Sequence, residues 1–295
     1  MEVNNPHDAF FIENFSNKEI ASSFIRGTFP VNIVNNLDLT TLQIDNNTYS
    51  DEELKKYFSD IVYNCKYKEL DIKISLLFEH KSFIPDYPFK QILKYMIKIW
   101  DYAEKQKENI IPVIPIIFYH GEKSWEYKKV YEYFPKMDDL LKDFIPDFDY
   151  ILTDMTHYTD NRIQDIFDNE LLKISLLIMK NIFNEDELKR NLEKFLTIGQ
   201  IYFNSESNLK ALESLLRYLW NCVENVSVDD IVKTLTKISE TGGNTAITIA
   251  MKLKNEGKIE GKIENAKKML VKGYLIEDIA DITGLSVEQI EKLKS

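Results

Sequence analysis

Two neighbouring stretches, SDIVYNCKYK (59–68) and DIKISLLFEHKS (71–82), decide the fold that this sequence predicts. Both are rich in β-branched and aromatic residues and are separated by Glu69-Leu70 alone, which is typical of an antiparallel hairpin. If those two residues form the tip, Asp60 lies directly opposite Glu79. Directly opposed side chains share one face of a sheet, with Cβ atoms about 5 Å apart. The hairpin therefore predicts a pair of close carboxylates.

These carboxylates and a nearby lysine predict metal-assisted phosphodiester hydrolysis. Lys81 lies two residues beyond Glu79 and so belongs to the same face of the strand. Mg²⁺ prefers oxygen ligands, and an ammonium can orient the attacking water or offset charge on the phosphate. From spacing alone, a surface hairpin with a cross-strand ion pair has equal weight. A register slip of one residue would also turn Asp60 to the other face.

Five blocks in order resemble a known family. Asp60 with Glu79-His80-Lys81 resembles the signature of the PD-(D/E)xK nuclease superfamily, and Gln91-Ile-Leu-Lys-Tyr95 resembles the QxxxY element of its RecB-type members. More specifically, the chain resembles the Rpn family of recombination-promoting nucleases, often labelled transposases. The blocks are NPHDAFF (5–11), SDIVY (59–63), LFEHKS (77–82), KYMIKIW (94–100) and PVIPIIFYHG (112–121). The third block of many Rpn members resembles Glu-His-Gln-Ser. Lys81, in place of that glutamine, differs from those members and matches the superfamily pattern.

The resemblance implies a Mg²⁺-dependent DNA endonuclease that promotes recombination through DNA breaks. It implies a restriction-endonuclease-like core in which Asp60 and Glu79 hold the metal and Lys81 positions the attacking water. Gln91 and Tyr95 would orient metal-bound groups or substrate. The resemblance also keeps one residue of the first helix, Glu19, as a secondary metal ligand.

Three other polar residues have a second interpretation or none. Ser16 and Glu19 form a capping box by their spacing, and we give this structural function more weight than a metal role for Glu19. His7 matches the family opening but has no assigned chemistry. For His120, at the end of the fifth block, we favour a turn-stabilising role over a place at the edge of a site.

A helix is predicted between Pro88 and about Lys105 by its apolar spacing. Lys90, Lys94 and Lys98 form a separate row on that helix, four residues apart. Such a row is usually a solvated face, although beside a metal site it could follow a phosphate backbone. We therefore keep the three lysines as candidate DNA-binding residues.

Composition allows a soluble globular protein but complicates DNA binding. Apolar residues make up 44%, charged residues 29%, and the formal net charge is −11. Phosphate neutralisation by Lys and Arg supplies most non-specific DNA affinity, and residues 61–107, with nine Lys against six Asp or Glu, are the plausible footprint. The acidic total favours a rival hypothesis, a nuclease-fold protein that binds DNA or a partner without cutting. We expect a cytoplasmic location, since no secretory signal or membrane-spanning run is evident.

The sequence predicts an α/β nuclease-like core, a mixed sheet flanked by helices, in residues 1–158. A helical bundle (159–250) and a helical tail (251–295) follow. Further strands are expected near 37–44, 110–119 and 150–154, and a short helix over 50–58. The bundle helices are expected at 171–183, 187–203, 208–223 and 228–239.

The tail carries a four-residue repeat and two short helices that resemble a helix-turn-helix. Gly257 and Gly261 would align on one helix face, which suggests close packing with a partner and makes a homodimer plausible. Glu288 and Glu291 are a poor complement to DNA, so we interpret the tail as mainly protein-binding. A third hypothesis is that the tail restrains a nuclease, so that its removal after about Gly242 raises activity.

Overall fold

The computed structural model describes residues 5–45, 59–79, 84–204, 209–223 and 226–293. The chain forms two compact units, Met1–Ser227 and Val228–Ser295, and each is described by itself. Compactness does not reveal which segments fold independently, so the three-part organisation expected from the sequence stays a prediction. Within the described residues, no helix is both long and apolar enough to cross a membrane.

A mixed β-sheet is the centre of the first unit. In the described residues it has five strands in the order β1-β2-β3-β4-β5, of which β1, β2 and β3 are antiparallel and β3, β4 and β5 are parallel. The strands are β1 (Leu37–Ile44), β2 (Ser59–Tyr67), β3 (Leu70–Glu79), β4 (Val113–Tyr119) and β5 (Ile151–Asp154). The mixed sheet with flanking helices confirms the expected fold class.

The hairpin of β2 and β3 is confirmed, but its expected register is wrong. Tyr67 pairs with Leu70, so Lys68 and Glu69 form the tip, and Asp60 pairs with Leu77 instead of Glu79. Lys68 takes the left-handed conformation, with φ of 53°, which a lysine can adopt in a tight turn without the glycine that usually marks one. The error is two residues along β3, so it changes the pairing and leaves each residue on its expected face.

Strand β4 accommodates a proline because its two neighbours overlap different parts of it. Pro115 pairs with Ser75 on β3, whereas β5 joins only from Ile116 onward. At Pro115 the strand is therefore still an edge on its β5 side, where a missing N–H breaks no ladder hydrogen bond. Pro115 is thus compatible with β4 as a central strand, although a proline usually argues against that position.

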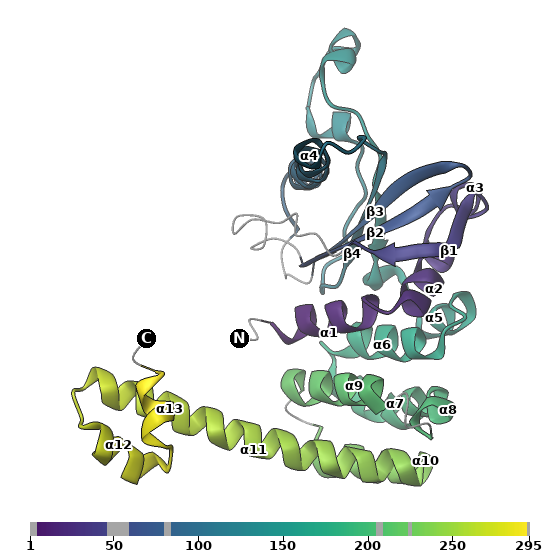
Figure 1. Ribbon diagram of the computed structural model, residues 1–295. Helices are drawn as coiled ribbons and strands as arrows, with labels where there is room; N and C mark the ends of the chain where they lie inside the picture. The colour runs from purple at the N-terminus through teal and green to yellow at the C-terminus, as the bar shows by residue number, and fades with distance from the viewer. Residues whose placement is uncertain (1–4, 46–58, 80–83, 205–208, 224–225, 294–295) are drawn as a thin grey trace. The chain divides into compact units, whose positions relative to one another are not determined.

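Helices cover both faces of the sheet (Figure 1). On one face α4 (Pro88–Gln106) packs through Ile92 and Met96 against a core that includes Val62 and Ile117. The other face is covered by α1 (Pro6–Phe15) and α2 (Lys18–Thr28), whose phenylalanines contact Phe118. The short α3 (Val31–Val34) leads into β1, and a long loop with the 3₁₀ helices η2 (Val130–Tyr133) and η3 (Asp139–Phe144) joins β4 to β5.

The remaining helices of the first unit pack beyond α1. They are η4 (Met155–His157), α5 (Asp160–Ile166), α6 (Glu170–Asn181), α7 (Glu185–Ile198), α8 (Gln200–Phe203) and α9 (Leu209–Cys222). The sequence predicts one helix over 187–203, but the structure breaks it at Gly199. A Cβ atom there would collide with the side chains of Ile174 and Phe203, so close packing of neighbouring helices requires glycine at this position.

The second unit contains α10 (Val228–Ile238), α11 (Glu240–Val271), α12 (Ile276–Thr283) and α13 (Val287–Glu291). Ala266, Ile279 and Ile290 form a small core that joins α11 to the two short helices. A Cβ atom built on Gly257 or Gly261 would meet nothing within 4 Å. Among the described residues, therefore, close packing does not explain the glycine repeat, and a partner helix remains a prediction.

Candidate functional site

The carboxyl edge of the parallel strands brings several polar positions into one row. Glu79 pairs with Tyr119 on β4, and Tyr119 pairs with Asp154 on β5. Asp60 pairs with Leu77, two residues before Glu79, so positions 60 and 79 are diagonal neighbours about 7–8 Å apart on the same face. The side chains of Asp60 and Glu79 lie outside the described part of the structure, so their role as metal ligands stays a prediction.

Helix α4 covers the same face as positions 60 and 79. Tyr119 shares a face with them and belongs to the core that contains Tyr95 of α4. Because β3 and β4 run parallel, α4 runs back between them and begins near the carboxyl end of β3. Gln91 and Tyr95 therefore lie in the first two turns of α4, toward the candidate edge.

At least one buried polar atom of helix α4 has no hydrogen-bond partner among the described residues. The side-chain oxygen Oε1 of Gln91 is buried and accepts no hydrogen bond there. Buried acceptors are nearly always satisfied by protein, water or ions. An amide oxygen in this position could accept from a water or bind a cation, as the candidate role of Gln91 requires.

Asp154 is a buried carboxylate at this edge that sequence reasoning missed. One of its oxygens accepts from the N–H of Trp125 at 2.7 Å, and the other accepts from the N–H of Thr156 at 2.8 Å. Asp154 thus fixes the loop that follows β4 to the end of β5. An aspartate at a strand end with a threonine two residues later is the signal for such a turn, and it is common enough to be easily overlooked.

A buried ion pair on the same face was also missed. The ammonium of Lys73 on β3 contacts the carboxylate of Asp45, just after β1, and donates to Oδ1 of Asn64 at 3.0 Å. The side chains of Lys73 and Asp45 are 10% and 4% exposed. This pair fastens the end of β1 to the hairpin that carries Asp60.

The structure does not place Glu19 on the face covered by α4. Its helix, α2, packs against the opposite face through Phe24 and Phe118. The expected capping box is wrong, because the N-cap is Asn17, whose side chain accepts from the N–H groups of Glu19 and Ile20. Ser16 and Asn17 are both good caps, so the sequence alone did not decide between them.

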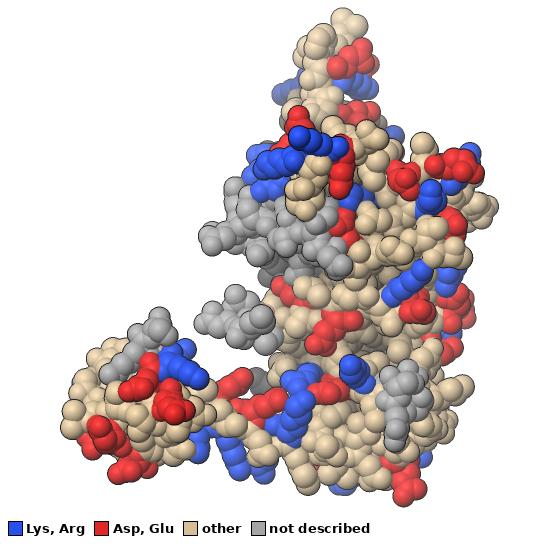
Figure 2. Space-filling view, in the orientation of Figure 1, with Lys and Arg blue, Asp and Glu red and all other residues tan. Residues whose placement is uncertain are grey.

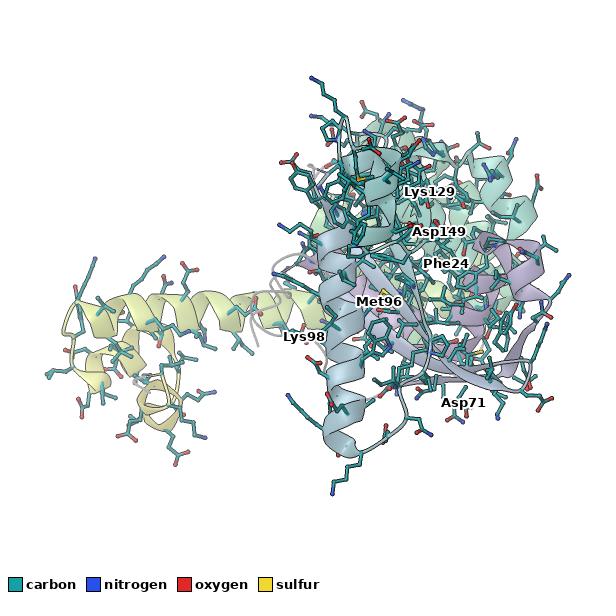
Figure 3. The ribbon with its side chains drawn as sticks, turned by 90° about the horizontal axis from the view of Figure 1, so that it is seen from above. Phe24, Asp71, Met96, Lys98, Lys129 and Asp149 are labelled. Carbon is teal, nitrogen blue, oxygen red and sulfur yellow. The ribbon has the colours of Figure 1, made fainter. Side chains whose placement is uncertain are left out.

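The lysine row lies on the outer side of α4. Lys90 and Lys94 are exposed, and Figure 3 shows Lys98 directed away from the sheet while Met96 points toward it. Lys and Arg side chains gather over α4 with Asp and Glu side chains beside them (Figure 2). Lys98 is half-buried and lies one turn after Tyr95, so the row borders the side of α4 that carries Tyr95. Its role in DNA binding stays a prediction.

Two expected features fall outside the described residues. Lys81 and His80 are the first, and the short helix over 50–58 is the second. Among the side chains that the structure describes, no group of three His, Cys, Asp or Glu is arranged to hold a metal ion.

A cavity of about 290 Å³ opens beside the carboxyl ends of β4 and β5, and we call it the edge cavity. Its lining includes His120, Gly121, Thr156, Lys180 and Phe183. His120 is buried, and its Nε2 lies 2.6 Å from the carbonyl oxygen of Met179. The structure places His120 in the wall of this cavity, and its turn-stabilising role stays a prediction.

His7, from the first of the five sequence blocks, packs behind two residues of this wall, His120 and Phe183. The ring of His7 lies 5.2 Å from that of His120, and its Nδ1 lies 2.7 Å from the hydroxyl of Tyr218 on α9. A larger cavity of about 640 Å³ lies elsewhere, between α1, α6 and α9. Its charged groups include Arg217 and Glu213, which are paired with each other at 2.9 Å.

Comparisons with known proteins agree with the family resemblance of the five sequence blocks. The family model described as "Putative transposase, YhgA-like" matches residues 5–210. From Escherichia coli (strain K12), the recombination-promoting nuclease RpnA is 25% identical over 97% of this chain and 96% of its own length. RpnC, another recombination-promoting nuclease of that strain, is 24% identical over 98% of this chain and 96% of its own length.

One relative of similar identity is named as inactive. The inactive recombination-promoting nuclease-like protein RpnE, also from Escherichia coli (strain K12), is 24% identical over 96% of both chains. No solved structure matches this chain. The matched region contains all five strands and the helices on both faces of the sheet, and on this evidence the chain belongs to the YhgA-like transposase family, with the Rpn recombination-promoting nucleases among its relatives.

Proposed function

We propose that this protein is a Mg²⁺-dependent DNA endonuclease that promotes recombination by breaking DNA. The observation that carries the proposal is the backbone register, which places Asp60 and Glu79 on the one face of the sheet that α4 covers, at the carboxyl end of β3. Relatives named recombination-promoting nucleases along nearly the whole chain support it.

The residues at this edge fit a magnesium ion. Carboxylate and amide oxygens are its preferred protein ligands. The buried Oε1 of Gln91, which has no hydrogen-bond partner among the described residues, is such an oxygen in the same layer. Asp60 and Glu79 would hold the ion, which when bound supplies charge to neutralise the phosphate and a water of lowered pKa. Lys73 of β3 is held by Asp45, so it is not a candidate for the catalytic role proposed for Lys81.

The chain's own groups would then have separate tasks. Lys81 would orient the attacking water and stabilise charge that develops on the phosphate. Gln91 would accept a hydrogen bond from a water at the site, and Tyr95 would fix the neighbouring wall. Asp154 would keep the loop after β4 in place through its two backbone hydrogen bonds.

The test is cleavage of supercoiled plasmid by the purified full-length protein in Mg²⁺, with EDTA as the metal control. Asp60→Ala should abolish nicking without changing the thermal unfolding temperature, because position 60 is at the open end of the hairpin. Asp71→Ala is the matched control, because Asp71 is an exposed carboxylate near the tip of the same hairpin (Figure 3). A fully active Asp60→Ala variant would refute the assignment.

A second candidate function is DNA or partner binding without cleavage. The net charge of −11 and the inactive relative favour it. It predicts that plasmid stays intact with full-length wild-type protein in Mg²⁺ while DNA binding remains measurable. The same plasmid assay, made with the full-length protein and with the protein that lacks Val228–Ser295 and combined with a gel-shift measurement, therefore decides between the two functions.

A further inference from the structure

The edge cavity adjoins the candidate site along the chain. His120 follows Tyr119, which pairs with Glu79. With strands about 4.8 Å apart and a rise of about 3.3 Å per residue, the Cα atoms of His120 and Glu79 are about 6 Å apart. Ligands of open α/β sheets bind outside the carboxyl ends of their parallel strands, and the edge cavity lies there. The side chain of His120 lies on the face opposite α4, where its Nε2 contacts Met179 of α6, so a DNA strand at Glu79 would reach the cavity by passing around the end of the sheet.

The wall of the edge cavity is aromatic and already ordered. Phe183 is 43% exposed, and its ring lies 4.8 Å from that of His120 and 6.1 Å from that of His7. Contacts with Met179 and Tyr218 hold the two histidines in place. An exposed phenylalanine backed by fixed rings offers a flat apolar face, on which any nucleobase can stack.

The charges around the cavity favour a neutral group over a phosphate. The ammonium of Lys180 is 2.9 Å from the carboxylate of Asp160, which neutralises it. Glu122 also lines the cavity and repels anions. A base carries no net charge and meets neither obstacle.

The size of the cavity decides how much of the DNA can enter. Small-molecule pockets are about 300–1,000 Å³, and about 290 Å³ is at the lower end of that range. A cavity of this size suits a small planar group such as a single base. We propose that the edge cavity binds a single unpaired or extruded nucleobase of the DNA substrate, stacked on Phe183, next to the phosphate held at Asp60 and Glu79.

The inference rests on the proposed function for its substrate but is tested without cleavage. Two labelled DNA duplexes are compared in EDTA by fluorescence anisotropy, one fully paired and one with a single unpaired 2-aminopurine. The wild-type protein should prefer the second duplex, because an unpaired base enters without the cost of unpairing. Stacking should also quench the fluorescence of the 2-aminopurine.

Phe183→Ala should weaken binding of the unpaired duplex about 5-fold to 100-fold, the usual effect of removing one stacking ring, and should abolish the quenching. Phe183→Tyr keeps the ring and should keep both properties. Ile201→Ala is the control, since Ile201 is an 82% exposed apolar residue of the same unit on α8. Equal affinity of the wild-type protein for both duplexes, or unchanged quenching in Phe183→Ala, overturns the inference.

Two further outcomes separate this inference from other possibilities. Displacement of the unpaired duplex by an equal concentration of free deoxynucleoside monophosphate would mean that the cavity takes free nucleotides, which overturns a site for a DNA strand. Plasmid cleavage by a wild-type protein with no preference for the unpaired base rejects the cavity and keeps the nuclease. A Phe183-dependent preference, with no cleavage by the full-length protein or by the protein that lacks Val228–Ser295, supports the cavity and rejects the nuclease.

Discussion

The buried pair of Lys73 and Asp45 allows a quantitative test of how the hairpin is held. Lys73→Met preserves the length of the side chain and removes its charge, so the 4% exposed carboxylate of Asp45 loses its ammonium partner. Breaking a buried ion pair from one side costs about 3–5 kcal/mol. We expect about 3 kcal/mol, because Asp45 keeps further polar interactions. Asp45→Asn should cost a similar amount.

The double variant separates the pair from its parts. Asp45→Asn combined with Lys73→Met leaves no unpaired buried charge, so its cost should be about 3 kcal/mol below the sum of the two single variants. Urea unfolding followed by tryptophan fluorescence suits the measurement, because Trp100, Trp125 and Trp220 all lie in the first unit. With a slope of about 3 kcal/mol/M, the midpoint of Lys73→Met should fall by about 1 M.

A matched control is available between β2 and β3 of the same sheet. Lys66 and Asp71 form an exposed pair at 3.4 Å, with 48% and 70% exposed side chains, and Lys66→Met should cost less than about 0.5 kcal/mol. A midpoint for Lys73→Met within about 0.3 M of the wild type, or strictly additive costs in the double variant, would refute the reasoning.

Three other predictions concern pH, thiol reactivity and the second unit. Burial alone would raise the pKa of the Asp168 carboxyl, but the Ser23 hydroxyl and the Arg26 guanidinium hold that pKa below its usual value of 3.8. Asp168→Asn should therefore lower the unfolding temperature at pH 7, and the difference from wild type should fade as the pH drops through the lowered pKa. An undiminished difference at pH 3 contradicts this prediction. Burial raises the pKa of the Cys222 thiol to about 12, so iodoacetamide at pH 8 should leave it unmodified in the native protein and label it in urea, as mass spectrometry can check. Removing Val228–Ser295 should raise the plasmid-nicking rate if that unit restrains a nuclease. Circular dichroism should first show that the truncated protein keeps its remaining helices. Equal nicking rates for the full-length and truncated proteins would then contradict restraint.

The boundary for that truncation illustrates what the structure adds to the sequence. A cut after Gly242 falls in the first turn of α11, where Gly243 packs closely against Thr236 of α10. It would separate two helices that stabilise each other. A cut after Ser227 follows the boundary between the compact units and avoids this damage.

Alternating and continuous apolar patterns predicted most of the sheet. The first strand was expected at Leu37–Ile44 and is observed there, and the strand ending at Asp154 was also found. The hairpin was placed correctly but paired two residues out, because no glycine or asparagine marks its tip and Lys68 takes a positive φ. The face of the sheet on which each residue lies could be predicted, but the pairing of residues between the two strands could not. A two-residue shift in register leaves every residue on the same face and the apolar pattern unchanged.

The site was less predictable than the sheet because it is built from distant segments. Gln91 and Tyr95 were expected from their four-residue spacing and a family resemblance, and the structure places both in the helix over the candidate face. By contrast, nothing local predicts that His7 and His120 meet in one wall, since only the packing of α1 against the end of β4 brings them together. The burial of Lys73 could not be predicted either, because the alternating pattern of a strand does not distinguish a buried, paired lysine from an exposed one.

The order of the strands has a consequence for how the chain folds during synthesis. β1, β2 and β3 are antiparallel neighbours in the chain, so their pairing closes only short loops, which costs little entropy. By contrast, the hydrogen bond between His7 and Tyr218 spans 211 positions. The strands that carry Asp60 and Glu79 can therefore pair while the ribosome is still adding α9. Until α9 arrives, Phe10 lacks the ring of Tyr218 that stacks on it at 4.2 Å, so a nascent chain has a formed hairpin and an uncovered first helix, a state in which chaperones would recognise α1.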